Sequence, residues 1–284
     1  MNNDIRQVAI TGRLGGYARK CKMELRAAVR ASTSRFHPSP VIVLGNQKAG
    51  TSAVAGLLSM ATECEVVIDF HREIRLPMFH KVIQGEASFE RFAKRNRWEF
   101  SKPIVKEPNI THMYDHLRSA FPHAKFIFVV RDPFSNIRSI IQRLSLPPRG
   151  NELKHCSNVP RVWRAILQIS QDEGGGYIGR FAANWRRCAD IFLCNQADMI
   201  AVRYEDFREN KRSTIESLAR SVGLKVKCNI EQYVNRPFQT AGTEVRDYFE
   251  YFGEDNCRTV CRICWPAASE FLYVPVESPL TRSQ

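Results

Sequence analysis

The sequence of 284 residues contains 42 lysines and arginines and 29 acidic residues, so its formal net charge is +13. Apolar residues make up 44% and charged residues 25%, which are typical values for a globular protein and exclude wholesale disorder. No apolar run approaches the ~18 residues of a membrane-spanning helix, and the N-terminus has no apolar signal-peptide core, so neither a membrane span nor secretion is expected. The positive charge favours an anionic partner, but charge alone leaves nucleic acid, a membrane surface and a phosphorylated small molecule open.

The N-terminal part of the chain carries a disproportionate share of this charge. Residues 1–40 hold eight basic and two acidic residues, which is +6 of the total of +13. The stretch 17–31 can form a basic amphipathic helix, which would either contact a membrane surface or lie solvated on the domain, and the second interpretation is favoured. A Pro-Ser-Pro segment then marks a boundary. We therefore expect a basic extension over residues 1–38 and one domain over residues 39–284.

Strand-like and helix-like segments alternate through the rest of the chain. Apolar runs of strand length occupy residues 41–44, 66–68, 103–105, 126–130 and 199–202. Helices are expected over residues 52–60, 113–120, 135–144, 177–193 and 211–222. This alternation predicts a single α/β domain with a mostly parallel central sheet flanked by helices, whose ligands would bind at the carboxyl ends of the strands. The domain shows no basic face with interleaved aromatic residues, so nucleic acid is not an expected partner.

A glycine-bounded loop follows the first strand and precedes a helix. Such a loop can cradle an anion, because its backbone N–H groups converge and the helix dipole adds about half a positive charge. In a nucleotide-triphosphate P-loop a lysine follows the second glycine, whereas here Thr51 follows Gly50 and the lysine is Lys48. The alternative is a tight turn with a surface lysine. The candidate loop residues are Gly45, Asn46, Gln47, Lys48, Ala49, Gly50, Thr51 and Ser52.

A second motif begins where the strand over residues 126–130 ends. Arg131 stands at the carboxyl end of this strand, and Ser139 lies two turns into the next helix. A guanidinium can bind a phosphate through two hydrogen bonds, and a hydroxyl can add one more. Arg131 could instead pair with Asp132 or Glu205 and hold the strand end, and this motif alone does not decide between the two.

Taken together, the two motifs resemble those of the sulfotransferase family, which transfers a sulfuryl group from 3′-phosphoadenosine 5′-phosphosulfate (PAPS). Lys48–Ser52 is similar to the family's K-x-G-T-[ST] loop, and Arg131 with Ser139 is similar to its 3′-phosphate motif. The resemblance covers most of residues 40–273 and implies a P-loop NTPase-like sulfotransferase fold, closer to bacterial and carbohydrate-type members than to the cytosolic phenol and steroid enzymes. Further similarities lie at Lys106-Glu107-Pro108, Trp185, Arg203-Tyr204-Glu205-Asp206 and residues 257–273.

This resemblance implies a set of donor-binding residues. Lys48 would neutralise the charge that develops on the 5′-phosphate leaving group, and the loop would hold its oxygens. Arg131 and Ser139 would bind the 3′-phosphate, with Trp185 and Tyr204 in the same set. The expected products are the desulfated nucleotide PAP and a sulfated acceptor, a carbohydrate, lipid or small alcohol that bears a hydroxyl (or an amine). Because a sulfuryl group carries one charge fewer than a phosphoryl group, no metal is expected.

The resemblance leaves the general base open. The phenol and steroid enzymes carry a K-T-H segment, but Lys106 is followed here by Glu-Pro, so that histidine is absent. Several carbohydrate and tyrosyl-protein sulfotransferases instead place a carboxylate downstream of the loop lysine. Asp69 is the first choice in this window, and His71 and Glu73 are the next candidates. Lys106 would assist at the sulfuryl oxygens.

The cysteines favour a reducing compartment. There are nine, an odd number in a chain without a signal peptide, so reduced thiols and a cytoplasmic location are expected. The spacing of Cys257, Cys261 and Cys264 could ligate an iron–sulfur cluster. The same spacing places all three on one face of a helix, and core packing is the favoured interpretation.

Two other functions are considered. A P-loop kinase that uses ATP and Mg²⁺ is suggested by the strand before Asp132, which is similar to a Walker-B strand, although the position of Lys48 and the presence of Arg131 argue against it. A non-enzymatic protein that binds anions or the membrane periphery would depend on the basic N-terminus. The acceptor pocket is expected between residues 71–100 and 144–176. Its candidate walls, most of them expected in the core, are Phe79, Phe92, Trp98, Phe100 and Trp163.

Overall fold

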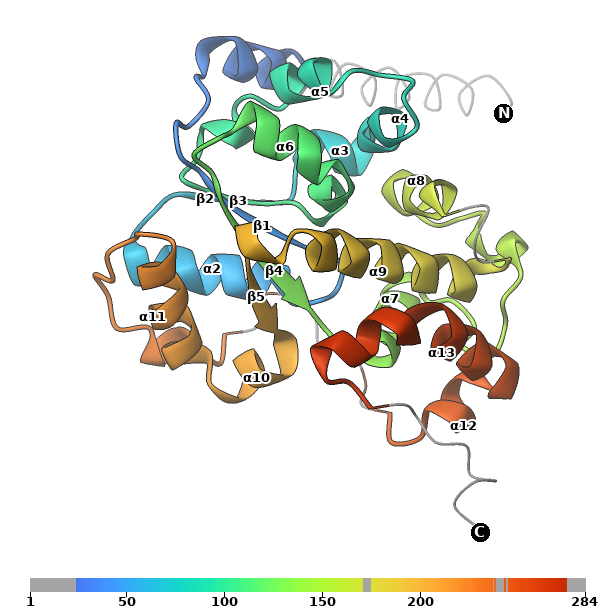
Figure 1. Cartoon of the computed structure of the whole chain (residues 1–284). Helices are drawn as coiled ribbons and strands as arrows, with labels where there is room; N and C mark the ends of the chain where they lie inside the picture. Colours follow the sequence, from blue (N-terminus) through green and yellow to red (C-terminus); the bar gives the residue numbers. More distant parts are fainter. Residues whose placement is uncertain (1–23, 171–174, 237, 239–242, 244, 275–284) are drawn as a thin grey trace, which may run out of the picture.

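The computed structural model describes residues 24–170, 175–236, 238, 243 and 245–274. Within this part, five parallel strands form one sheet in the order β2-β3-β1-β4-β5. Figure 1 shows the sheet at the centre of the molecule with helices on both sides. The expected parallel α/β fold is therefore confirmed. The strands are β1 (Val41–Gly45), β2 (Val66–Ile68), β3 (Ile104–Lys106), β4 (Lys125–Val130) and β5 (Met199–Arg203).

The helices fall into a long and a short group. All five helices expected from the sequence are present, with ends that differ by up to two residues. The long helices are α2 (Thr51–Thr62), α7 (Pro133–Leu144), α9 (Tyr177–Cys194), α11 (Lys211–Ser221) and α13 (Glu254–Ala268). The short helices are α3 (His71–Arg75), α4 (Phe79–Ile83), α5 (Phe89–Arg95), α6 (Tyr114–Ala120), α8 (Arg161–Ile169), α10 (Tyr204–Glu209) and α12 (Tyr248–Phe252).

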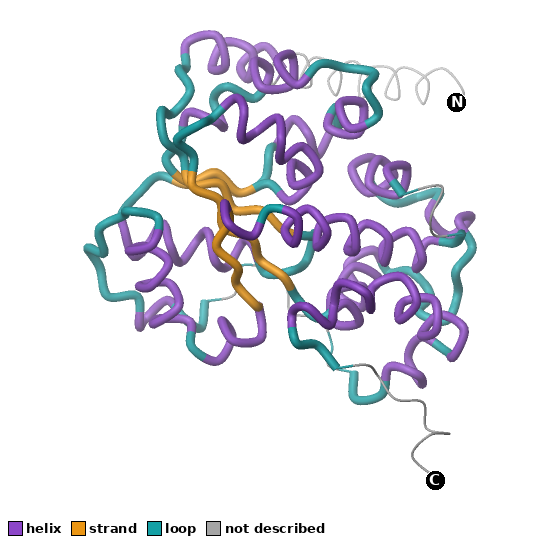
Figure 2. Tube along the Cα trace, viewed as in Figure 1, coloured by secondary structure: helices purple, strands orange, loops and turns teal. Residues whose placement is uncertain are grey.

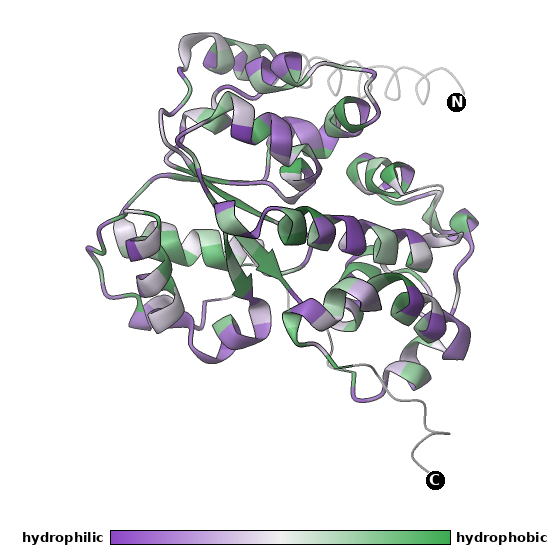
Figure 3. Ribbon diagram, viewed as in Figure 1, coloured by the Kyte–Doolittle hydropathy of each residue, from purple (hydrophilic) through white to green (hydrophobic). Residues whose placement is uncertain are grey.

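Alternate residues of β1 enter two separate cores, which explains why this strand is apolar along its length. Val41 and Val43 belong to the smaller core, beneath α2 and α11. Ile42 and Leu44 belong to the larger core on the opposite face of the sheet. Figure 2 shows the strands between the two helical layers, and Figure 3 shows that the strands are mainly apolar.

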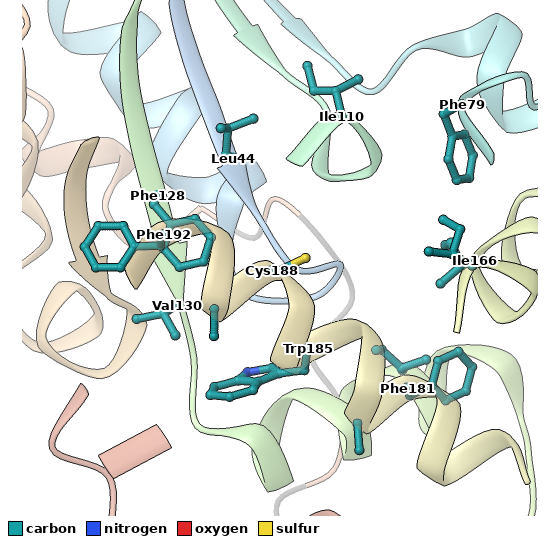
Figure 4. Packing of buried hydrophobic residues seen from close by; sticks show 14 of the residues in the cluster. Leu44, Phe79, Ile110, Phe128, Val130, Ile166, Phe181, Trp185, Cys188 and Phe192 are labelled. Atoms are coloured by element: carbon teal, nitrogen blue, oxygen red, sulfur yellow. The ribbon is translucent and has the colours of Figure 1, made fainter. Parts of the chain in front are cut away.

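The larger core joins the sheet to α9 and α13. The Phe128 ring of β4 stacks on the Phe192 ring of α9 with a centroid distance of 5.0 Å. Trp185 and Phe181 extend the contact along α9, as the close view in Figure 4 shows. Of the candidate pocket walls, Phe79, Phe92 and Phe100 are fully buried in this core, as expected for most of them.

The three clustered cysteines lie on α13 and pack against its neighbours. The Cys257 thiol donates to the Tyr248 carbonyl oxygen at 3.3 Å, and the Cys264 thiol donates to the Ala182 carbonyl oxygen at 3.5 Å. Burial is the main cause that raises the pKa of Cys257 to about 12, so its thiol stays protonated. These contacts support core packing for the cysteines.

Residues 24–38 are the described part of the segment that is expected to form a basic extension. Residues 24–33 are helical, in agreement with the expected helix, whose residues 17–23 lie outside the described residues. Arg72 holds this helix to the domain through an ion pair of 3.0 Å with Glu24. Of the helices that the structure describes, none has the length and apolar character to cross a membrane.

Candidate active site

The loop between β1 and α2 is shaped by two glycines with positive φ angles. At Gly45 (φ 139°), a Cβ atom would lie 2.3 Å from the Val129 carbonyl oxygen of the neighbouring strand. At Gly50 (φ 102°), a Cβ atom would lie 2.3 Å from Cδ2 of Tyr204. Both positions therefore require glycine, because an L side chain would meet strain and a close contact together.

The N-terminus of α2 follows the loop directly and has no acidic residue in its first turn. Gly50 is its N-cap residue and has no side chain that could cap the end. The first N–H groups of a helix have no intrahelical acceptor, and the helix dipole favours negative charge at this end. Thr51 and Ser52 begin the helix and add hydroxyl groups. These features give the loop the helix N-terminus on which the expected anion cradle depends.

Buried amide side chains hold this loop from the inside. Asn46 Nδ2 donates to Asn136 Oδ1 at 2.8 Å, and Asn184 Nδ2 donates to Asn46 Oδ1 at 2.6 Å. Gln47 Nε2 donates to Asn109 Oδ1 at 2.7 Å, and Asn136 Nδ2 donates to the Gln47 carbonyl oxygen at 3.0 Å. None of the five is more than 7% exposed. A buried network of this kind fixes the loop in one conformation.

A cavity of about 340 Å³ opens at the carboxyl ends of β1, β2 and β3. Lys48, Thr51 and Ser52 line it from the loop and α2, and Asp69 and Lys106 line it from the ends of β2 and β3. The convergence follows from the parallel register, since Val43 of β1 lies beside Lys106 and Lys106 lies beside Ile68 of β2. The remaining lining residues are Gln47, Gly50, Ile74, Glu107, Pro108, Asn109, Arg143, Val162, Trp163 and Ile166.

Asp69 and Lys106 form an ion pair within this cavity. The Lys106 side chain is 3% exposed, whereas the Asp69 side chain is 35% exposed, so the carboxylate is the accessible partner. The Asp69 backbone is in the left-handed region (φ 62°), and its N–H donates to the Lys106 carbonyl oxygen at 2.9 Å. Left-handed backbone is uncommon outside glycine and often marks functional sites.

Glu107 lies directly behind this pair and is 1% exposed. Its carboxylate accepts hydrogen bonds from the Phe70 N–H at 2.8 Å and from the Asn109 N–H at 3.0 Å. Burial is the main cause that raises the pKa of Glu107 to about 7; the Asp69 carboxylate raises it further and Lys106 opposes the rise. Glu107 therefore braces the turns that carry the Asp69–Lys106 pair.

Lys48 is the central cation of the cavity. Its backbone is also left-handed (φ 66°). Burial lowers the pKa of Lys48, and the positive charges of Arg143, Arg131 and Lys106 lower it further, while Asp69 opposes them. An anion bound here would relieve this repulsion, since it would bring negative charge among four cationic side chains.

Arg131 joins the end of β4 to the loop. Its Nη1 donates to the Lys48 carbonyl oxygen at 3.2 Å, and its guanidinium carbon lies 4.6 Å from the centre of the Tyr204 ring. Trp185 Nε1 donates to the Arg131 carbonyl oxygen at 2.9 Å. Burial is the main cause that lowers the pKa of Arg131.

The carboxylates that could have paired with Arg131 have other partners. Asp132 Oδ1 caps α7 by accepting from the Ser135 N–H at 2.7 Å. Glu205 Oε1 accepts from the Asp132 N–H at 3.2 Å, and Glu205 Oε2 accepts from the Tyr273 hydroxyl at 2.9 Å. Among the described residues, no carboxylate lies within ion-pair distance of Arg131. The strand-end salt bridge considered from the sequence does not form.

Several sequence candidates lie outside the cavity. His71 begins α3 and is exposed, and it is not among the lining residues. Glu73 is fully buried and accepts hydrogen bonds from the N–H groups of Met78 and Phe79, at 2.6 and 3.1 Å. Ser139 is half-buried on α7, and neither it nor Arg131 is among the lining residues.

Other residues of the site were not expected from the sequence. Arg143 lines the cavity from the last turn of α7, and Glu107 and Asn109 line it after β3. Asn184 lies inside an apolar stretch of α9. A polar residue at such a position is the one feature of the sequence that could have indicated its role in the site. In the part of the chain that the structure covers, no three His, Cys, Asp or Glu side chains converge into a metal-binding group.

A match to a protein-family model shows which family this chain belongs to. A family model described as "Sulfotransferase family" matches residues 78–227, just over half of the sequence. The chain belongs to the sulfotransferase family. The match includes Lys106, Arg131 and Ser139, while the loop with Lys48 lies before it. No curated protein matches this sulfotransferase-family chain.

One of two solved structures that are similar to this chain supports the fold of this family. Sulfotransferase STF9 from Mycobacterium avium superposes with a TM-score of 0.51 at 12% identity, over 91% of this chain and 80% of that one. A sulfotransferase from Alicyclobacillus acidocaldarius gives a TM-score of 0.46 at 13% identity, over 83% and 99% of the two chains. At 12% identity, the similarity to the Mycobacterium avium structure supports the fold alone.

Proposed function

We propose that this chain transfers a sulfuryl group from PAPS to a hydroxyl (or amine) of an acceptor and releases PAP. The observation that carries the proposal is that one cavity contains the N-terminus of α2, the cations Lys48 and Lys106, and the accessible carboxylate of Asp69. The first three suit a phosphosulfate group, and the carboxylate suits the deprotonation of an attacking hydroxyl.

In the proposed reaction, the acceptor oxygen forms a bond to sulfur while the bond from sulfur to the bridging oxygen of the 5′-phosphate breaks. The acceptor proton passes to Asp69, a general-base contribution of roughly 10²–10⁴-fold. Lys48 and the N–H groups of Thr51 and Ser52 stabilise the charge on the departing phosphate. Removing one such preorganised donor typically costs about 3–4 kcal/mol of the activation barrier. Lys106 orients Asp69 and faces the sulfuryl oxygens.

The 3′-phosphate would bind at Arg131 and Ser139. The Tyr204 ring supports the guanidinium, and the Trp185 indole fixes the backbone of Arg131 rather than reaching the cavity. We therefore propose that Trp185 acts as a positioning residue in the donor site. The cytoplasmic location and the basic extension over residues 1–38 remain predictions from the sequence.

A kinase that uses ATP and Mg²⁺ is the alternative. The carboxylate of Asp132, which would have to reach the metal, instead caps α7 by accepting a hydrogen bond from the Ser135 N–H. Because Asp132 serves as a helix cap and is not available to a metal ion, sulfuryl transfer is favoured over a kinase reaction.

The test compares donors first. PAP should raise the melting temperature of the protein more than ATP with Mg²⁺ does, and label from PAPS should pass to at least one acceptor in a panel of carbohydrates, lipids and small alcohols. Lys48→Ala should abolish transfer while PAP binding remains. Lys125→Ala, at an exposed lysine on the opposite end of the sheet, is the control and should be active. Stabilisation by ATP with Mg²⁺ alone would support the kinase instead.

A further inference from the structure

A second hollow, which we call the basic groove, lies outside the proposed donor site and has a volume of about 1060 Å³. It is bounded by the helix of residues 24–33 and by α3, α4, α5 and α8, which gather in the upper part of Figure 1. Its lining residues are Glu24, Ala28, Ala31, Ser32, Arg72, Leu76, Pro77, Met78, His80, Lys81, Glu86, Ala87, Arg91, Lys94, Arg95, Arg97, Arg161, Arg164, Ala165 and Gln168.

Positive charge dominates the basic groove. Eight of its lining residues are lysine or arginine and two are acidic. Some of the cations are neutralised, as Arg72 is by Glu24 at 3.0 Å. Four are exposed and, within the described residues, have no carboxylate at ion-pair distance; these are Lys81, Arg91, Arg161 and Arg164. An uncompensated cluster of this kind attracts an extended anion.

Helix α8 separates the basic groove from the proposed donor cavity. Arg161 and Arg164 line the groove, whereas Val162, Trp163 and Ile166 of the same helix line the cavity. Helix α3 is shared in the same way, because Arg72 lines the groove and Ile74 lines the cavity. A long molecule held in the groove would thus lie one helix away from Asp69 and Lys106.

We propose that the basic groove binds an acidic polysaccharide and that this polymer supplies the hydroxyl for the proposed sulfuryl transfer. The assignment of the acceptor rests on the proposed function, whereas the binding of the polymer does not. A carboxylated glycan chain offers repeated negative charges to the arginines and lysines. It also offers repeated hydroxyls, and a hydroxyl near the end of the glycan chain would reach Asp69.

Other polyanions fit the basic groove less well. Its described lining contains no Phe, Tyr or Trp, so the bases of a single-stranded nucleic acid would find no aromatic ring to stack on. The site is a hollow lined by residues from several helices, so a flat membrane surface would fit its shape less well than a flexible chain would. An acidic peptide would meet the charges but brings few hydroxyls.

The test measures binding without the donor. Fluorescein-labelled oligogalacturonate, a carboxylated polysaccharide, is titrated with the full-length protein and followed by anisotropy, with neutral dextran of equal length as the uncharged probe. The groove variant is Arg161→Glu with Arg164→Glu. The matched control is Arg208→Glu with Arg220→Glu, two exposed arginines on α10 and α11 on the other side of the sheet.

The groove variant should weaken oligogalacturonate binding by about tenfold or more, whereas the control pair should change it less than twofold, because charge reversal acts locally at a specific site. PAP affinity and melting temperature should be unchanged in both, which separates this result from a failure of the donor assignment or of folding. The neutral pair Arg161→Gln and Arg164→Gln should show a smaller loss. Equal weakening by both charge-reversed pairs, or tighter binding of polyglutamate, an oligonucleotide or anionic vesicles than of oligogalacturonate, would overturn the proposal.

Discussion

The Arg131 guanidinium donates a hydrogen bond of 3.2 Å to the carbonyl oxygen of Lys48. This contact joins the end of β4 to the loop after β1, across 83 residues of sequence. Lys48 has a left-handed backbone, and Arg131 supplies a donor for its carbonyl oxygen. A substitution of Arg131 should therefore also affect the conformation of the loop that carries Lys48.

Arg131→Ala should weaken PAP binding by about tenfold to a hundredfold, which is the range expected for a lost charged hydrogen bond. The effect of phosphate binding is separated from that of loop support by titrating adenosine 5′-phosphate, which has no 3′-phosphate. If Arg131 binds the 3′-phosphate, the variant should lose the preference for PAP over this nucleotide. If the binding of both nucleotides is weakened equally, Arg131 supports the loop and does not bind the 3′-phosphate.

Gly50→Ala tests the close approach of Tyr204 to the loop. The new Cβ would lie 2.3 Å from Tyr204 Cδ2 at a φ of 102°, so a loss of about 1–3 kcal/mol in the free energy of unfolding and weaker PAP binding are expected. Gly85→Ala is the matched control, because Gly85 also has a positive φ (78°) but nothing lies within 4 Å of the added atom. Urea unfolding should show the smaller loss for Gly85→Ala. If the two variants behave alike, the Tyr204 contact is unimportant.

Arg143→Gln should move the alkaline limb of the activity profile. Burial lowers the pKa of Lys48 most, and the charge of Arg143 is the next cause. Lys48 therefore loses its proton, and its proposed function, at a lower pH than an ordinary lysine. Removing the positive charge of Arg143 raises that pKa, so the fall of kcat/KM should shift to higher pH in the variant. Arg208→Gln should leave the limb in place, and an unmoved limb in Arg143→Gln would contradict the assignment of the limb to Lys48.

The sheet and the convergence of the candidate residues were predictable because both depend on local patterns. Apolar runs specify the buried strands, and a parallel sheet brings the carboxyl ends of adjacent strands together. Lys48, Asp69 and Lys106 follow or end three such strands, and the structure places all three in one cavity.

The short elements and the inner support of the site depend on tertiary contacts that the sequence does not reveal. Helices α3 and α4 have five residues each, too few for a periodic pattern, and Glu73 holds the turn between them by accepting the N–H groups of Met78 and Phe79. Asn184 reaches Asn46 from 138 residues away. Hydrogen bonds between residues so far apart in the sequence can be identified only once the fold has brought the two side chains together.

Glu107→Gln should flatten the pH dependence of stability. The pKa of Glu107 is raised from 4.5 to about 7, chiefly by burial, so the folded state binds a proton that the unfolded state has already lost. This contribution to stability is complete below about pH 4.5 and is lost as the pH rises through 7, with a size of up to about 3 kcal/mol. Urea unfolding at pH 5 and pH 8 should therefore show a larger fall for the wild type than for Glu107→Gln. The exposed Glu86→Gln variant should fall as the wild type does, and an unchanged fall in Glu107→Gln would show that Glu107 titrates normally in the fold.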